Sequence, residues 1–549
     1  RDLHLSIRRQ RQMCIRDSTT TTTTTTNATT TTATHIFLIT LRNLLLKKIK
    51  IVSRSSHLAR VQAYKVGAKI QNTFPTMDIE YCSKKSEGDI NPNQSISSGE
   101  VTGLFTHNIS NAISNGEYDI GVHSWKDVPL KPSKNSTIFG TIDRGDMRDM
   151  LFIKKKSIDD LKKETLSIFT SSPRRKYISE IILRDLLPFE KAKLSFHDIR
   201  VNIETRLKKL NESNLDGLII AKTAIDRLLS NQYNKDDHDS SNKIKKYIDD
   251  FKWMILPLSC FPTSPGQGAI GIEANNSNDK VIKIINQINN KEVFQMVQHE
   301  KSKLNIYGGG CHQKIGVSNW TVNDLELESI QGITDEGLSL NSYKIMSKKK
   351  ENRINSKRSN AFPSNDNEKK LFSRKHIDSS RVIKELRNSI VYISRKNVLR
   401  GTPHIDDSNI VWTSGLTAWK AAAQKGYWVN GTSDSFGESI DFDIDSLSGK
   451  ISKRVKLTHM ENKSTEMDIV PTYKLIFSDK KLGIEERTHF YWMSSFAFDC
   501  VTQKYPEIKN KIHGCGPGKT YDHILKKISN PDKVSKYLSI EDWESNFDS

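Results

Sequence analysis

A lysine and an aspartate stand next to each other where a strongly apolar run of the chain ends. The segment GVHSWKDVPL, residues 121–130, has the pattern of a buried strand followed by a polar cluster that contains Ser124, Lys126 and Asp127. Ligands of open α/β sheets bind at the carboxyl ends of the strands. An ammonium group beside a carboxylate suits proton transfer and the binding of an anion. The alternative is a surface salt bridge at a strand end, and composition alone leaves both open.

Hydroxyl groups precede a pair of arginines in the segment FTSSPRRK, residues 169–176. Thr170 and Ser172 stand just before Arg174 and Arg175, at the junction expected between a strand and a helix. Exposed backbone N–H groups, hydroxyls and guanidinium groups all suit a carboxylate or a phosphate. The alternative is an ordinary helix cap with a basic first turn. That alternative is weakened because cations are unfavourable at a helix N-terminus unless an anion lies there.

Three more arginines and two glycine-rich segments are weaker signals. Arg200 and Arg206 lie in DIRVNIETRLKKL and Arg227 lies in AKTAIDRL, and each by itself is typical of a solvated helix arginine. The segment SPGQGAIGIEA is a poor phosphate loop because no Gly-Lys-Ser/Thr follows it. The segment GCGPGKT has His513 where the phosphate-loop motif requires its first glycine, so we predict no such loop there.

Three consecutive glycines precede a cysteine in GGGCHQKIGV, residues 308–317. Glycine lets the backbone approach closely and clears side chains from around the sulfur of Cys311. A buried structural cysteine does not need such a setting, whereas a thiol that anchors a bulky group on an exposed loop does. A free cysteine in a flexible loop is the alternative.

The elements that must position these residues alternate between strand and helix. Apolar alternation predicts strands over 48–54, 77–83, 118–124 and 166–172, and residues 215–229 read as a strand followed by a helix. A helix with Ser55 or Ser56 as its N-cap follows the first strand. Residues 317–346 alternate in short runs, as in a sheet of β-hairpins. The pattern therefore predicts α/β layers.

Three segments have too little apolar character to form a core. We expect residues 1–46, which are basic and then rich in threonine, to be a disordered leader that is either a transit peptide or foreign sequence. Residues 231–245 are interpreted as a polar surface insert. Residues 347–380 are interpreted as a basic disordered linker, because residues 347–376 hold ten Lys and Arg against three Asp and Glu. The α/β pattern resumes after this linker.

Composition limits the class of protein. The 549 residues carry 84 Lys and Arg against 64 Asp and Glu, a formal net charge of +20, which suggests an anionic partner and nucleic acid as the first candidate. The sequence contains no run of 18 apolar residues, so it predicts no transmembrane helix. Six scattered cysteines without a CxxC pair indicate a reducing compartment rather than a disulfide framework or a metal site.

Taken in order, the motifs resemble hydroxymethylbilane synthase, also called porphobilinogen deaminase. The resemblance covers about residues 48–346 and rests on SRSSHLARVQA, EGDI, GLFT, VHSWKDVP, DRGDMRD, TSSPRRK, IRVNIETRL, SPGQGAIGIE and GGGCHQKIGV. It implies a transferase that adds four porphobilinogen units, with loss of ammonia, to a dipyrromethane cofactor held covalently by one cysteine. Linear hydroxymethylbilane is then released for tetrapyrrole (heme or chlorophyll) biosynthesis.

The resemblance assigns a role to each singled-out residue. Asp127 matches the catalytic aspartate, and Cys311 matches the cysteine that carries the dipyrromethane. Residues implied to bind the cofactor are Lys126, Ser124, Thr170, Ser172, Arg174 and Arg175. Residues implied to bind the carboxylates of the substrate are Arg54, Ser56, Arg200, Arg206 and Arg227. Each pyrrole carries an acetate and a propionate, so a growing chain needs guanidinium groups around it.

The fold class implied is α/β, with two periplasmic-binding-protein-like open-sheet domains and a small α+β domain. We expect domain 1 at 47–142 and 251–285, domain 2 at 143–250, and the cofactor-attachment domain at 286–346. Residues 381–549 form an extra α/β region whose two similar blocks weakly resemble the halves of uroporphyrinogen-III synthase. The chain is then either bifunctional, or this region is a non-catalytic remnant or accessory domain. Ser98 and Thr102 depart from the family pattern, because lysines are expected at both positions.

Partners and rival functions follow from the same resemblance. We expect small-molecule substrate only, no metal, no nucleic acid, no membrane and a monomer, in the cytoplasm or in an organelle such as a plastid. The rival interpretation is a non-enzymatic anion-binding module of periplasmic-binding-protein-like fold. Asp127 and Cys311 separate the two, since a module that only binds needs neither.

Overall fold

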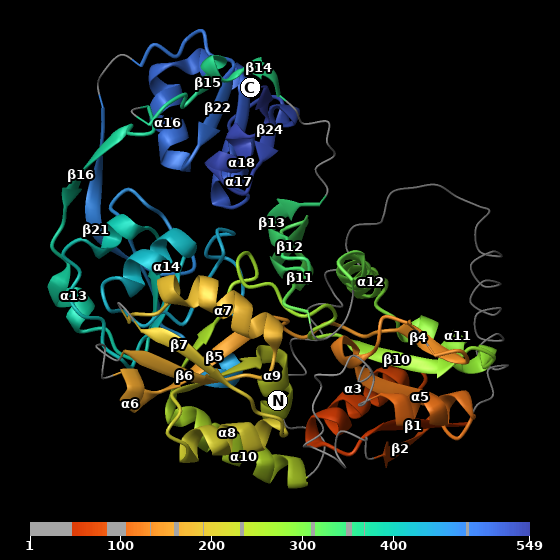
Figure 1. The fold of residues 1–549 in the computed structure, drawn as a ribbon. Helices are drawn as coiled ribbons and strands as arrows, with labels where there is room; N and C mark the ends of the chain where they lie inside the picture. The colour runs from red at the N-terminus through yellow and green to blue at the C-terminus, as the bar shows by residue number, and fades with distance from the viewer. Residues whose placement is uncertain are drawn as a thin grey trace, which may run out of the picture.

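The structure of the protein is a computed structural model. It describes residues 47–84, 106–131, 133–158, 164–189, 192–230, 235–308, 313–346, 354–366, 368–478 and 482–548. These form two lobes with related sheets, a small domain and two C-terminal lobes (Figure 1). Within these ranges no helix has both the length and the apolar character needed to cross a membrane.

Lobe 1 is built on a five-stranded mixed sheet in the order β2-β1-β3-β10-β4. Strands β1, β2 and β3 are parallel, and β10 runs antiparallel to both β3 and β4. Ser56 accepts the N–H of Ala59 and so caps the first helix, as the sequence predicts. Its elements are β1 (Lys48–Arg54), α3 (His57–Thr73), β2 (Asp78–Lys84), α5 (His107–Ser114), β3 (Ile120–Ser124), β4 (Ser136–Gly140), β10 (Ile270–Asn275) and α11 (Asp279–Ile288).

Lobe 2 repeats this topology with the strand order β7-β6-β8-β5-β9. Strands β6, β7 and β8 are parallel, and β5 runs antiparallel to both β8 and β9. The chain therefore crosses between the lobes twice, from β4 to β5 and from β9 to β10. Its elements are β5 (Asp149–Lys154), α6 (Lys155–Ile158), β6 (Thr165–Phe169), α7 (Pro173–Leu186), β7 (Lys193–His197), α8 (Ile203–Glu212), β8 (Gly217–Ala221), α9 (Lys222–Leu229), α10 (Lys235–Asp249) and β9 (Phe251–Ile255).

Two expectations about lobe 2 need correction. The boundary that we placed before residue 251 is wrong for β9, because this strand pairs with β5 and completes the sheet of lobe 2. The polar insert at 231–245 is helical in part: α10 begins at Lys235, and its buried residues Ile244 and Ile248 anchor it to the lobe. The prediction rested on the average composition of the segment, which does not reveal two apolar residues one helical turn apart at the end of a polar run.

The small domain packs a helix against a three-stranded antiparallel sheet. Helix α12 (Lys291–Ile306) contacts β11 (Gly316–Val322), which continues into β12 (Leu325–Ile333) and β13 (Ser339–Ile345). This confirms the hairpins that the sequence predicts over 317–346. The loop between α12 and β11 contains Cys311, which lies outside the described residues.

The C-terminal region forms two further α/β lobes. Lobe 3 has a six-stranded sheet, β16-β21-β20-β17-β18-β19, and lobe 4 has a four-stranded sheet, β15-β22-β23-β24. The chain passes between them from β15 to β16 and from β21 to β22, and β16 and β21 pair antiparallel. The elements are β15 (Ala361–Phe362), β16 (Phe372–His376), α13 (Ser380–Lys384), β17 (Ile390–Ile393), β18 (Ile410–Thr413), α14 (Leu416–Ala423), β19 (Gly431–Thr432), α15 (Asp445–Ser448), β20 (Arg454–His459), β21 (Asp468–Phe477), β22 (His489–Trp492), α16 (Ser495–Lys504), β23 (Ile512–Cys515), α17 (Lys519–Leu525), β24 (Val534–Lys536) and α18 (Ile540–Glu544).

The segment expected as a disordered linker over 347–380 differs from that expectation. From residue 354 onward the chain forms β14 (Ile354–Lys357), which pairs with β25 (Phe547–Asp548), and then β15 and β16. The buried residues Ala361 and Phe362 enter the core of lobe 4. The many charged residues around them stay at the surface, which explains why average composition suggested disorder.

Lobe 3 shares its core with lobe 2. One apolar cluster joins Leu186 and Met254 of lobe 2 to Trp419 and Val429 of lobe 3, and the indole N–H of Trp419 donates to the carbonyl of Leu186 at 2.9 Å. Figure 1 shows α14 lying against α7. The core of lobe 1, in contrast, contains only residues between 49 and 288.

Candidate functional site

The candidate residues gather at the carboxyl ends of parallel strands, as the sequence predicts. In lobe 1, Arg54 ends β1 and Ser124 ends the neighbouring strand β3. A 3-10 turn, η1 (Trp125–Asp127), follows β3 directly. Trp125 is buried against Phe294, and its backbone N–H donates to Ala269. The anchored tryptophan fixes the turn, which leaves the side chains of the next two residues half-buried.

Asp127 carries a carboxylate without a hydrogen-bond partner in the described part of the chain. Two cations act on it: Lys126 beside it in the turn, and Arg206 of α8 in lobe 2. Arg206 is held at the start of α8, since its Nε donates at 2.7 Å to the carbonyl of Val201, which lies just before the helix. A carboxylate near two cations, with its oxygens uncommitted, can stabilise a positive charge on a ligand and accept a proton from it.

Lys126 is poised to change its charge near neutral pH. Burial lowers the pKa of its ammonium group to about 8, although Asp127 opposes this shift, and Arg175 and Arg174 add to it. Its Nζ lies 3.5 Å from Oε1 of Gln267. Because the unpaired ammonium is costly in this position, an anionic ligand that neutralises it would be bound strongly.

The pair Arg174 and Arg175 is committed to an internal partner. Nη2 of each guanidinium donates to Asp149 at 2.7 Å, and all three side chains are buried. Burial raises the pKa of Asp149, but the two guanidinium groups outweigh it and hold that pKa well below its usual range. The sequence indicated the anion correctly but not its source: the carboxylate here belongs to the protein itself.

The glycine-rich loop at 264–268 joins these groups. Nε2 of Gln267 donates to Asp149 at 2.9 Å, and its Oε1 lies 3.5 Å from both Lys126 and Arg175. Gly268 adopts φ +85°, and a Cβ there would lie 2.5 Å from the carbonyl oxygen of Gly145. The glycine-rich segment thus serves close backbone packing. Sequence reasoning missed Gln267, because its partners are more than 90 positions away along the chain.

The hydroxyl candidates are mostly engaged in local structure. Ser124 exchanges hydrogen bonds with Gln62 of α3 at 2.8 and 3.2 Å. Ser172 caps α7 by accepting the N–H of Arg175, and Thr170, which is buried, accepts the N–H of Ser172 at 3.3 Å. These contacts fix the strand-to-helix junctions on which the charged groups are mounted.

The remaining arginines fall into two groups. Arg227 of α9 is buried and donates to the carbonyl of Gly268 at 2.6 Å, and burial lowers the pKa of its guanidinium to about 10. Arg54 is half-buried at the end of β1, while Arg200 is exposed just beyond β7. Because β6, β7 and β8 are parallel, Arg200 lies at the same edge of the sheet as the arginine pair.

The small domain is docked beside Asp127. Nζ of Lys301 in α12 donates to the carbonyl of Val128 at 2.8 Å, next to the catalytic candidate in sequence. Glu300 forms a bidentate pair with Arg144, both bonds 2.9 Å, and accepts the N–H of Gly266. Cys311 lies outside the described residues, as do Ser98 and Thr102.

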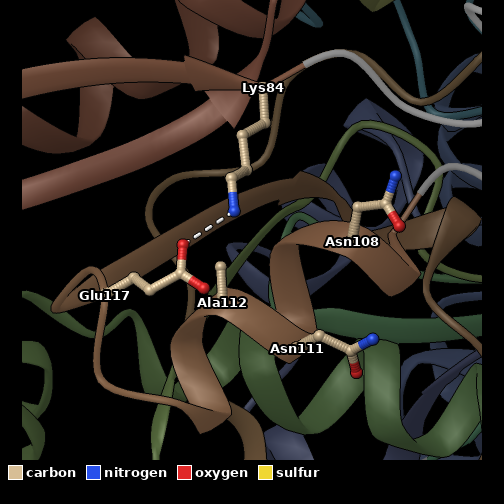
Figure 2. Close-up of a pocket in the computed structure, with 5 residues that line it drawn as sticks. All are labelled: Lys84, Asn108, Asn111, Ala112 and Glu117. Atoms are coloured by element: carbon tan, nitrogen blue, oxygen red, sulfur yellow. Dashed lines mark hydrogen bonds and ion pairs between the residues drawn. The ribbon is translucent and has the colours of Figure 1, made fainter.

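One hollow of about 250 Å³ lies elsewhere on lobe 1 (Figure 2). It lies between the end of β2 and α5, and an ion pair between Lys84 and Glu117 at 2.8 Å crosses it. None of the residues predicted to act in catalysis lines it. We therefore place the candidate site at the strand ends around Asp127 and not in this hollow.

The fold and the site define an α/β protein with two related mixed sheets and a cationic strand edge around one uncommitted carboxylate. Comparison with known proteins gives the family. Residues 49–283 match the family described as "Porphobilinogen deaminase, dipyromethane cofactor binding domain". The chain belongs to the porphobilinogen deaminase family.

Relatives from distant organisms agree. The porphobilinogen deaminase of Caldicellulosiruptor saccharolyticus is 35% identical over 309 residues, which are 54% of this chain and 97% of that protein. That of Nostoc sp. is 32% identical and covers 51% of this chain and 80% of its own length. Among solved structures, the methionine binding protein MetQ covers 50% of this chain with 12% identity and a TM-score of 0.26, which is too low to support a conclusion.

Proposed function

We propose that residues 47–346 form a hydroxymethylbilane synthase. This unit would join four porphobilinogen molecules into a linear tetrapyrrole on a dipyrromethane bound through Cys311. The observation that carries the proposal is the uncommitted carboxylate of Asp127, which interacts electrostatically with Lys126 and Arg206 within the part of the chain that matches the family. A module that only binds anions has no use for a carboxylate there, because like charges repel.

The residues present suit a cofactor that carries several carboxylates. The half-buried ammonium of Lys126 has no full ionic partner among the described residues, and the carboxylates of a pyrrole would supply one. Gln313, at the described end of the attachment loop, is buried, and its Oε1 has no hydrogen-bond partner among the described residues. When bound, the dipyrromethane supplies the free pyrrole carbon to which the next unit is joined.

The protein side chains would divide the work of each addition. Porphobilinogen loses its amino group as ammonia, and a carbon–carbon bond forms as the acceptor pyrrole gives up one proton. Asp127 would stabilise the positive charge that develops on the departing unit and receive that proton. Lys126, Arg206, Arg54, Arg200 and Arg227 would hold acetate and propionate groups. Ser56, Ser124, Thr170 and Ser172 would keep the strand ends in place, and Asp149 would orient Arg174 and Arg175.

Mass spectrometry of the intact full-length chain tests the cofactor. After expression in a host that makes porphobilinogen, the chain should be heavier than its sequence by two linked pyrrole units, and Cys311→Ser should have the sequence mass. Cys260→Ser is the matched control and should keep the added mass, since Cys260 lies in the segment between β9 and β10 and not in the attachment loop. A wild-type chain of unmodified mass would contradict the proposal.

Turnover of porphobilinogen tests the role of Asp127. Asp127→Asn should retain bound substrate but slow turnover by ~10²–10³, the usual loss when one charge-stabilising group is removed. Asp335→Asn, an exposed position in the hairpin of the small domain, should behave like the wild type. Equal turnover in Asp127→Asn and the wild type would remove Asp127 from the mechanism.

We also propose that lobes 3 and 4 are uroporphyrinogen-III-synthase-like and act on the released product. Support comes from two α/β lobes joined by the paired strands β16 and β21, with Ser414 and Ser494 at equivalent strand ends. Arg395 of lobe 3 donates to the carbonyl of Met493 of lobe 4 at 2.6 Å, which brings those ends together. The full chain should then yield the type III isomer of uroporphyrinogen, and a pure type I product would refute this second activity.

We propose that the protein is a monomer and requires neither nucleic acid nor a membrane.

A further inference from the structure

Two segments connect lobe 1 to lobe 2, and they lie against each other. Residues 141–148 lead from β4 to β5, and residues 256–269 lead back from β9 to β10. The N–H of Leu256 donates to Asp149 at 2.8 Å, and that of Gly145 donates to Gly268 at 3.1 Å. Any rotation of one lobe relative to the other must be absorbed by these two crossing segments, which we call the hinge.

Lobe 3 binds both halves of the hinge. Asp434 accepts two hydrogen bonds from Ser259, from the backbone N–H at 3.1 Å and from the hydroxyl at 2.5 Å. Arg148 donates to the carbonyl of Phe442 at 3.1 Å. One contact therefore falls on each crossing segment, and both come from the same short stretch of lobe 3.

A buried lysine strengthens this attachment. Lys222 at the start of α9 is fully buried and lies 3.4 Å from Asp146 of the hinge, 2.8 Å from Asp226 of its own helix and 3.1 Å from Asp443 of lobe 3. Ser446 donates to the other oxygen of Asp226 at 2.7 Å. The hinge, lobe 2 and lobe 3 thus meet around one ammonium group.

Charge balance does not require the carboxylate from lobe 3. Lys222 and Arg148 are already matched by Asp146 and Asp226, and Asp443 adds a third negative charge while its own side chain is 59% exposed. Its removal would leave a neutral cluster and no unpaired buried lysine. The contact is therefore better explained as a tether between parts of the chain than as a requirement for folding.

We propose that Asp434 and Asp443 are positioning residues. Asp434 ties the returning hinge segment to lobe 3 directly through Ser259, and Asp443 ties Lys222, the partner of Asp146 in the other hinge segment, to lobe 3. Lobe 2, the hinge and lobe 3 then form one body, and lobe 1 is the part that moves. Asp149, the holder of Arg174 and Arg175, follows the first hinge segment directly. A slack hinge would therefore displace the arginine pair relative to Asp127. This link to catalysis rests on the proposed function, whereas the tether does not.

Hydrogen–deuterium exchange on the full chain tests the tether. In the double variant Asp434→Asn/Asp443→Asn, peptides over 141–149 and 256–261 should exchange about tenfold faster, because the bonds from Ser259 to Asp434 and the ion pair of Lys222, the partner of Asp146, with Asp443 are weakened. Strands β3 and β17 should exchange as in the wild type. Asp445→Asn, an exposed position two residues from Asp443, should change nothing. Unchanged exchange in the hinge, or equally faster exchange in β3 and β17, would overturn the proposal.

Turnover of porphobilinogen supplies a second readout. The double variant should lower kcat several-fold with KM unchanged, since the groups that bind substrate are intact, and Asp443→Glu should restore most of the rate that Asp443→Asn loses. A raised KM at normal kcat would refute the positioning role. An inactive wild-type chain would reject the proposed function, yet the exchange result would still decide whether the tether exists.

Discussion

Asp149 determines what the arginine pair can do. Arg174 and Arg175 share its carboxylate, so their guanidinium groups are held in fixed directions before any ligand arrives. Gln267 adds a fourth hydrogen bond to the three that the arginines donate to the same oxygens. Preorganised cations lose little freedom when they bind an anion, which favours recognition of carboxylates. We therefore expect Arg174 and Arg175 to form a rigid, preorganised part of the site.

Replacement of Asp149 should show this dependence. Asp149→Asn would leave two buried guanidinium groups without a counter-charge, and we expect the free energy of unfolding to fall by ~3–5 kcal/mol. Urea denaturation of the full chain measures it. Asp198→Asn is the matched control: Asp198 pairs with Lys176 at the surface, so its loss should cost less than ~1 kcal/mol. Equal losses in the two variants would contradict the structural role of Asp149.

Lys126 should make catalysis sensitive to pH. Because burial lowers its pKa to about 8, the ammonium group loses its proton as pH rises through that value, and with it the attraction for substrate carboxylates. We expect kcat/KM for porphobilinogen to decline above about pH 8, since this ratio reports ionisations of the free enzyme. Lys126→Arg should remove the decline, because a guanidinium keeps its charge throughout. The exposed variant Lys131→Arg should keep the wild-type profile, and a decline that persists in Lys126→Arg would exclude Lys126 as its cause.

At the scale of elements, local sequence patterns predicted much of the fold. Strands β1, β2, β3, β6 and β8 and the Ser56 cap lie where the patterns placed them. The contacts that organise the site were not predictable in this way. Asp149 meets Arg174 and Gln267 only after the chain has crossed between the lobes, and a single sequence does not reveal such pairs. The catalytic roles of these residues stay predictions.

The loop at 264–268 depends on the absence of a side chain. Gly268→Ala would place a Cβ 2.5 Å from a backbone oxygen of the facing crossing segment, at φ +85°. Neither backbone can yield cheaply, so we expect a loss of ~2–4 kcal/mol in the free energy of unfolding. Gly337→Ala has nearly the same φ, +87°, but open space around it, and should cost only ~1 kcal/mol. Thermal unfolding of both variants separates the clash from the backbone strain, and similar losses would argue against the close approach.

At the scale of the whole molecule, residues 47–346 and the C-terminal region do not form separate structural units. Lobe 2 contributes residues to two apolar clusters that continue into lobe 3. The indole N–H of Trp428 and the amide of Asn430 both donate to the carbonyl of Trp253 at 2.9 Å.

The net charge of +20 first suggested nucleic acid as the partner. Of the cations that the structure places near the strand ends, Lys126 and Arg206 act on Asp127, while Arg174 and Arg175 bind Asp149. Such an arrangement suits a small ligand with several carboxylates.

A shared core predicts shared unfolding. Trp419 of lobe 3 is fully buried against lobe 2, and Trp419→Ala should lower the free energy of unfolding by ~3–5 kcal/mol, as for other large core truncations. Hydrogen–deuterium exchange should then speed up in α7 of lobe 2 as well as in α14 of lobe 3. Trp543→Ala is the matched control, because Trp543 packs in a cluster of lobe 4 with Tyr491 and Tyr537, and its loss should leave α7 unchanged. Faster exchange confined to lobe 3 in Trp419→Ala would mean that lobes 2 and 3 fold separately, since a common core transmits the loss of one side chain to both of its walls.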